Sequence, residues 1–253
     1  MLPDTHAHLD AVEFAEDCDV VIARAVVAGV SPILAVGSDL SSSRRAVELA
    51  ARHPMVFAAV GTHPHEADRF VAQAPELRDL LAADKVVAVG EIGLDYYRDG
   101  VDRDTQREAF AEQLRWASEL HLPVSVHNRD ADDDVLAAVA ASGVLAILHC
   151  FSGSRAFAGR ALLLGCYLSL AGNLTFKRAD DLRVVASNLP GDRLLVESDA
   201  PVLAPQQWRG RRNEPAHVAA TAQTLADVRG VSNAEMEKTL AANAATVFNW
   251  EPA

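Results

Sequence analysis

The chain has 253 residues, half of them hydrophobic, and a formal net charge of −12. This length and composition suffice for one large core, and we expect a single domain over residues 1–253. The acidic balance excludes a general attraction to nucleic acid or to anionic membranes, so a polyanion must bind at a local site. No leader-like or membrane-spanning apolar run is found, and the odd number of cysteines fits reduced thiols; we therefore expect a cytoplasmic monomer without an obligate protein partner.

Short apolar runs rich in β-forming residues alternate with longer amphipathic stretches along the chain. The pattern predicts strands over 1–6, 31–37, 56–61, 86–93, 122–128, 145–150, 166–172 and 193–199. Helices are predicted between them, for example over 41–53, 102–121 and 130–143, with Ser or Asp near their starts as candidate N-caps. One more helix is predicted over 232–249.

Eight such units favour an α/β fold, a closed (β/α)8 TIM barrel in a single domain with a C-terminal extra helix. The predicted strands are nearly continuous apolar runs, as a parallel sheet covered by helices requires. A doubly wound open sheet is the rival. It would normally carry a G-x-G-x-x-G turn after its first strand, and none stands there.

The predicted strand ends carry most of the histidines of the chain. In such a barrel the C-terminal ends of the strands form the active face. Alternation along the first strand places His6 and His8 on the same side. Six of nine histidines fall at these ends, together with four carboxylates: His6, His8, His63, His65, His127, His149, Glu91, Asp95, Glu197 and Asp199.

Imidazole and carboxylate side chains that meet at one mouth predict a divalent-metal site. One tetrahedral ion takes about four ligands, whereas six candidates are available, so two ions are the economical interpretation. Glu91, with two oxygens, is the candidate bridge between them. The six candidate ligands are His6, His8, Glu91, His127, His149 and Asp199.

The chain also resembles the TatD family of metal-dependent deoxyribonucleases, within the amidohydrolase-like hydrolases. The motifs that carry the resemblance run in order over nearly the whole chain: "DTHAHLD", "GTHPHEA", "VGEIGLDYYRD", "PVSVHNRDA", "LHCFSGS" and "LLVESDAP". The resemblance implies a distorted barrel with one ion on His6, His8, Glu91 and Asp199 and a second on Glu91, His127 and His149. Many relatives bridge their ions with a carboxylated lysine, but no lysine here ends the fourth or fifth strand.

Together with the ligand pattern, the resemblance implies hydrolysis of a phosphodiester by a water activated between two divalent ions, zinc, manganese or magnesium. Histidine ligands favour zinc-like ions, while the resemblance implies magnesium-supported turnover. Asp199 is the candidate to orient the water and take its proton, beside the bridging Glu91. His63, by the resemblance, and Arg129, by its forked guanidinium, are candidates to contact the phosphate.

The expected substrate is DNA, single-stranded and cleaved from an end. A loop with Arg209, Arg211 and Arg212 beside Trp208 is a further candidate contact for such a strand. His65 is expected at the surface, and the face of Glu197 is left open. The alternatives are a dimetal amidohydrolase or lactonase acting on a small substrate, and a non-catalytic metal-binding or nucleic-acid-binding protein.

Overall fold

The computed structural model describes residues 1–250 and contains an eight-stranded parallel sheet whose strands lie side by side in chain order. Each predicted strand overlaps an observed one. β8 returns to β1 through a short bridge between Ala7 and Ala200, so the sheet forms a nearly closed barrel, as predicted. The strands are β1 (Leu2–Ala7), β2 (Val30–Val36), β3 (Val56–Val60), β4 (Val86–Asp95), β5 (Val124–Arg129), β6 (Ala146–Leu148), β7 (Tyr167–Leu170) and β8 (Leu194–Val196).

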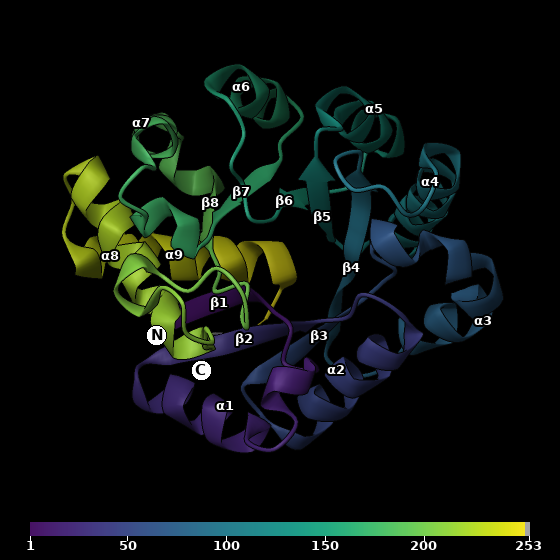
Figure 1. Cartoon of the computed structure of the whole chain (residues 1–253), viewed down its shortest axis with the longest axis horizontal. Helices are drawn as coiled ribbons and strands as arrows, with labels where there is room; N and C mark the ends of the chain where they lie inside the picture. Colours follow the sequence, from purple (N-terminus) through teal and green to yellow (C-terminus); the bar gives the residue numbers. More distant parts are fainter. Residues whose placement is uncertain (251–253) are drawn as a thin grey trace.

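Helices follow the strands and surround the sheet (Figure 1). They are α1 (Cys18–Val27), α2 (Leu40–Arg52), α3 (Phe70–Leu80), α4 (Arg103–Leu120), α5 (Asp132–Ser142), α6 (Arg155–Leu163), α7 (Asp180–Asn188) and α8 (Val218–Arg229). Short 3-10 turns occupy several loops: η1 (Val12–Phe14), η2 (Pro64–Arg69), η3 (Gly172–Thr175), η4 (Gly191–Arg193), η5 (Gln206–Trp208) and η6 (Pro215–His217).

Helix starts are fixed by local hydrogen bonds where the sequence supplies a capping side chain. The carboxylate of Asp102 accepts the N–H of Thr105 at the start of α4, as expected. Asp39 caps α2 from just ahead of the predicted stretch. The N-cap residue of α5 is Ala131, which has no side-chain cap, although Asp residues fill its first turn and favour the positive end of the helix dipole.

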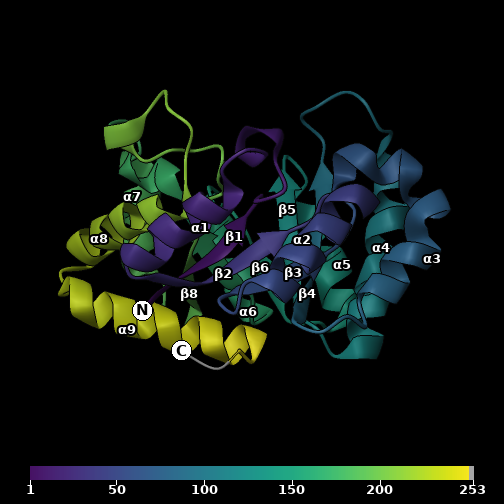
Figure 2. The same ribbon diagram turned by 90° about the horizontal axis from the view of Figure 1, so that it is seen from below.

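The last helix, α9 (Asn233–Phe248), confirms the expected C-terminal extra helix and begins at the N-cap Ser232. Figure 2 shows it crossing the end of the barrel opposite the long loops that follow β4 and β8. Val247, Phe248 and the following Trp250 pack there against strand residues such as Leu34 and Leu195. Each large side chain buried in this way contributes about 1.5–3 kcal/mol. Polar chemistry is thereby left to the other end of the barrel.

No helix within residues 1–250 is both long and apolar enough to cross a membrane. Cys18, Cys150 and Cys166 are all free thiols, as the sequence predicted.

Candidate metal centre

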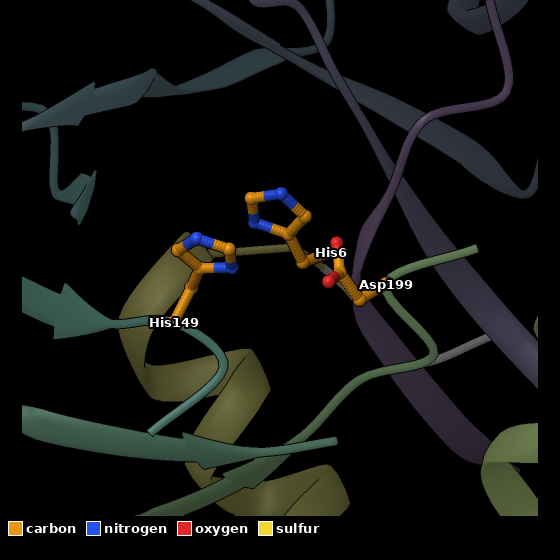
Figure 3. A group of neighbouring side chains, drawn as sticks. All are labelled: His6, His149 and Asp199. Atoms are coloured by element: carbon orange, nitrogen blue, oxygen red, sulfur yellow. The ribbon is translucent and has the colours of Figure 1, made fainter. Parts of the chain in front are cut away.

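The C-terminal ends of the strands surround a pocket of about 930 Å³. Seven predicted site residues line it: His8, His63, Glu91, His127, Arg129, His149 and Asp199. His6 lies beneath them and is fully buried. Figure 3 shows His6, His149 and Asp199 pointing toward one another from β1, from the loop after β6 and from the loop after β8. The barrel therefore brings the predicted residues together at one mouth.

The first cluster of donor atoms surrounds Oε2 of Glu91. This oxygen lies 3.5 Å from Nε2 of His6 and 3.4 Å from Nε2 of His8, and the two nitrogens are 3.3 Å apart. Oδ1 of Asp199 is 3.8 Å from Nε2 of His8. Four ligands around one tetrahedral zinc-like ion are separated by about 3.3–3.6 Å, from metal–ligand distances of about 2.0–2.2 Å. The donor atoms of His6, His8 and Glu91 have this spacing and lie within 4.8 Å of one another, whereas Asp199 forms such a group with His6 and His149.

The second cluster surrounds the other oxygen of the same carboxylate. Oε1 of Glu91 lies 3.0 Å from Nδ1 of His127 and 2.8 Å from Nε2 of His149, and these two nitrogens are 3.4 Å apart. Glu91 is buried, and each of its oxygens faces a different pair of histidines. One carboxylate thus joins two adjacent groups of donors, as the bridging position requires.

The outer nitrogen of each of these four histidines has a partner. A metal-binding imidazole must present a lone pair inward, and a partner that accepts the outer N–H fixes that tautomer. The pairs are His6 Nδ1 with Ser125 Oγ (3.0 Å), His8 Nδ1 with the carbonyl oxygen of Val36 (3.2 Å), His127 Nε2 with Asp95 Oδ2 (3.2 Å) and His149 Nδ1 with Glu197 Oε1 (3.3 Å). The outer contacts of these four histidines therefore suit the tautomers that metal ligands need.

His63 has the opposite arrangement. Its outer nitrogen, Nδ1, accepts the backbone N–H of His65 at 3.1 Å, so in the neutral ring the proton is on Nε2. Nε2 lies 3.3 Å from Oε1 of Glu91. Burial lowers the pKa of His63 to about 4 despite the nearby Glu91, which keeps the ring neutral at pH 7. His63 thus presents a hydrogen-bond donor to the centre, although its position alone fits a ligand group with Glu91 and His127.

Two buried carboxylates, Glu197 and Asp95, contact candidate ligands, a task that the sequence did not assign to them. Glu197, whose face was left open, is fully buried and accepts the N–H of Cys150 at 2.6 Å besides contacting His149. Asp95 contacts both His127 and His65, the latter at 2.8 Å. His65 is therefore a half-buried neighbour of the centre, and the expectation of a plain surface residue is wrong.

The electrostatics of the centre favour positive charge. Burial alone raises the pKa of Glu91, but the charges and hydrogen bonds of His149, His63 and His127 hold it well below its usual value. Burial lowers the pKa of His8, yet Glu91 and Asp199 raise it to about 9. The carboxylates thus favour a proton on the ring of His8, and a divalent cation competes with that proton for the inner nitrogen.

The basic loop after β8 differs from the expectation. Arg212 donates to both carboxylate oxygens of Asp17 at 2.8 and 2.7 Å and packs over Phe14, and Trp208 stacks on His217 with ring centroids 3.9 Å apart. These two residues have structural partners and do not face the mouth. Arg209 is exposed and lies over the ring of Phe176.

Arg129 occupies the rim of the main pocket, where its guanidinium lies 3.8 Å above the centroid of Tyr97. The ion pairs of residues 1–250 do not include Arg129. Its forked donors remain available to a phosphate.

Comparison with known proteins identifies the relatives of this chain. The family described as TatD related DNase matches residues 3–249. An uncharacterized metal-dependent hydrolase, YabD of Bacillus subtilis, is 39% identical over 252 residues, which cover 98% of this chain and 99% of YabD. The 3'-5' ssDNA/RNA exonuclease TatD of Shigella flexneri is 36% identical, with coverage of 97% and 98%. The crystal structure of YJJV, a TatD homolog from Escherichia coli K12, has a TM-score of 0.95 at 32% identity over 99% of this chain and 98% of that one.

Proposed function

The chain belongs to the TatD related DNase family of metal-dependent hydrolases, and from this premise we propose that it is an exonuclease that removes nucleotides from single-stranded DNA. The observation that carries the proposal is the placement of Glu91 between two pairs of histidines at the mouth of the barrel. Such a centre suits the in-line displacement of a phosphodiester, in which attacking and leaving oxygens both need stabilisation.

Two divalent ions are part of the proposal. His6, His8, Glu91 and Asp199 would hold one of them, and Glu91, His127 and His149 would hold the other. The histidine-rich donors favour zinc or another imidazole-preferring ion, whereas magnesium and manganese prefer oxygen ligands. When bound, the ions supply Lewis acidity that lowers the pKa of water and neutralises charge on the phosphate.

Asp199 is the proposed residue that orients the attacking water and accepts its proton. It lines the main pocket, and its backbone N–H donates to the carbonyl oxygen of His6 at 2.9 Å, which fixes its position beside the ligands. Burial raises the pKa of Asp199 to about 6, although His149 and His8 oppose that rise. A cation bound beside Asp199 would lower this pKa and keep the carboxylate ionised, the form that accepts a proton from water.

His63 and Arg129 are the proposed contacts to the phosphate. The tautomer of His63 supports donation of a hydrogen bond from Nε2 to a phosphate oxygen. Arg129, two residues after His127 at the rim of the same pocket, offers two parallel donors. Together they would place the scissile phosphate over the carboxylate of Glu91.

The decisive experiment compares substrates under one set of conditions. Metal-loaded protein is incubated with end-labelled single-stranded DNA, with the matching duplex, and with an amide and a lactone. We expect stepwise shortening of the single strand and slow or no loss of the other substrates. Rapid turnover of the amide or lactone with intact DNA would overturn the proposal in favour of a small-substrate hydrolase.

A further inference from the structure

A second pocket, of about 550 Å³, lies beside the main one on the same face of the barrel. It is formed by the loops after β7 and β8, and Asn173 lines both pockets, so the two adjoin. We call it the lateral pocket. The residues used below to define it are Asn173, Phe176, Lys177, Arg178, Gln206 and Arg209.

The lateral pocket is lined by three cations and by no acidic residue. Near the lateral pocket, the arginines that form ion pairs within residues 1–250 are Arg183, Arg193 and Arg212. The three cations that line the pocket, Lys177, Arg178 and Arg209, are exposed and take part in none of these ion pairs. On a chain with a net charge of −12, three unneutralised cations at one pocket make a local site for a polyanion.

The side of the main pocket formed by the loops after β1, β2 and β3 offers no comparable cationic site. Asp10, Asp39 and Glu66 line it there. Arg45, which also lines it, is paired with Asp10, and Glu66 is paired with Arg69. Compared with that side, the cations of the lateral pocket attract a polynucleotide toward the loops after β7 and β8.

The lateral pocket also contains an aromatic surface. The guanidinium of Arg209 lies 4.2 Å from the centroid of the Phe176 ring, which is partly exposed. Nucleobases stack on aromatic rings and on guanidinium planes without regard to sequence. A second stacked pair, Arg129 on Tyr97, stands at the rim of the main pocket.

The two loops that form the lateral pocket are tied together. The N–H of Gln206 donates to Oγ1 of Thr175 at 2.7 Å, and the N–H of Lys177 donates to Oε1 of Gln206 at 3.2 Å. At the junction with the main pocket, Oδ1 of Asn173 is buried and has no hydrogen-bond partner within residues 1–250. The pocket is thus preformed, and its junction holds a polar atom that a ligand can satisfy.

We propose that the lateral pocket binds a nucleotide of the single-stranded substrate that lies beyond the two nucleotides joined by the phosphodiester at the metal centre, with its base stacked on Phe176 and Arg209 and its phosphates contacted by Lys177 and Arg178. This inference rests on the proposed exonuclease function and adds a site that determines which substrates are used: strands long enough to reach it are preferred over short ones.

The test uses the metal-loaded enzyme and the triple variant Lys177→Ser, Arg178→Ser, Arg209→Ser. The matched control, Arg44→Ser, Arg160→Ser, Lys238→Ser, removes the same charge from exposed positions on α2, α6 and α9.

The substrates are a single-stranded decanucleotide, a dinucleotide and bis(4-nitrophenyl) phosphate. We expect the pocket variant to lose about 10- to 100-fold in kcat/KM on the decanucleotide, the range for one stacked base. The control should keep that activity, and both variants should hydrolyse the two small substrates at wild-type rates.

Salt dependence separates charge from stacking. The slope of log kcat/KM against log salt should become shallower by about 1.4 in the pocket variant, because two phosphate contacts, those of Lys177 and Arg178, are removed at about 0.7 each. Phe176→Leu should lower decanucleotide hydrolysis and leave the slope unchanged. Thermal unfolding verifies that each variant is folded.

The outcomes distinguish this inference from the proposed function. Wild-type protein that cleaves no single-stranded DNA refutes the exonuclease itself. If wild type cleaves the decanucleotide and the pocket variant matches the control on it, the lateral pocket has no role in binding while the exonuclease stands.

Discussion

Individual histidines at this centre differ in chemistry according to what their outer nitrogen contacts. Where the outer nitrogen donates to an acceptor, as in His127 with Asp95 and His149 with Glu197, the inner nitrogen presents a lone pair. Where it accepts, as in His63 with the N–H of His65, the inner nitrogen presents a proton. The contact of the outer nitrogen thus separates the histidines that are candidate metal ligands from His63, which is a candidate hydrogen-bond donor.

The proposed bridging role of Glu91 predicts an ordering of variants. Glu91→Gln should lose activity more completely than His8→Ala, because an amide does not bridge two ions as an anionic carboxylate does, whereas loss of His8 removes one ligand of one ion. Steady-state turnover at saturating metal measures both. Near-native turnover of Glu91→Gln would show that the bridge is assigned to the wrong residue.

The carboxylates behind the ligands should control metal affinity. Glu197→Gln and Asp95→Asn each remove the charge that orients a histidine, and we expect each to weaken metal binding by about 10- to 100-fold. Titration of activity with zinc or manganese measures this, and high metal should restore much of it. The control is Asp133→Asn, an exposed carboxylate in the first turn of α5, which should bind metal as the wild type does.

At the scale of elements, β4 and the β8–β1 seam position the centre. β4 carries Glu91 and pairs with β5, where Gly93 stands opposite His127. At the seam, the buried carboxylate of Asp4 accepts the N–H of Ser198 at 2.8 Å and contacts its hydroxyl at 2.6 Å. These contacts fix the loop that places Asp199 beside His6.

Gly93 should be irreplaceable for a steric reason. Its φ is +140°, and a Cβ there would overlap the carbonyl oxygen of His127. Gly93→Ala should cost roughly 3 kcal/mol or more, because the backbone of β4 or β5 must shift. Gly143→Ala, also at positive φ but in open space, should cost about 1 kcal/mol. Urea unfolding compares the two, and equal losses would refute the steric account.

Asp4 should make stability depend on pH. Burial raises the pKa of Asp4 to about 8, against the hydrogen bonds of Ser198 and with the help of Glu197. The folded state then holds a proton that the unfolded state releases near its ordinary pKa. The proton on Asp4 therefore stabilises the folded state fully below about pH 4. As the pH rises toward 8 this stabilisation is lost, by at most about 1.4 kcal/mol per pH unit.

The variant Asp4→Asn keeps the shape of the side chain and removes the charge. Urea unfolding of both proteins in chelator, at pH 5 and pH 8, should show that the wild type loses stability relative to the variant as the pH rises. A constant difference between the two proteins would contradict the assignment.

For the whole molecule, one end of the barrel is apolar and the other is a polar mouth. α9 closes the apolar end, while Glu91, Glu197 and Asp199 are all buried at the mouth. Buried carboxylates are costly without neutralising charge, so bound cations should stabilise the fold as well as the transition state.

Metal binding should therefore raise the stability of the whole chain. An ion at 100 times its Kd adds about 2.7 kcal/mol for each site. We expect close to two divalent ions per chain by elemental analysis after saturation, and a lower Tm in chelator. A ratio near one, with His127 and His149 unliganded in a crystal structure, would show that only one site exists.

The sequence by itself determined the barrel, because strand and helix patterns are local and each apolar run is bounded by its own turn residues. It also determined the candidate ligands, since parallel strands bring all their C-terminal ends to one face and the histidines follow those ends. The alternation of side chains along β1, which predicted His6 and His8 on one side, is likewise a local property of the sequence.

Only the tertiary structure decided which partner each side chain meets. Glu197 and His149 are 48 residues apart, and alternation after Val196 no longer applies because Asp199 adopts a positive φ of 52°. Arg212 and Arg209 are neighbours in the loop after β8, yet one is paired with Asp17 and the other lies over Phe176. Such contacts depend on how loops from distant strands approach one another in space, and no periodicity within the chain encodes them.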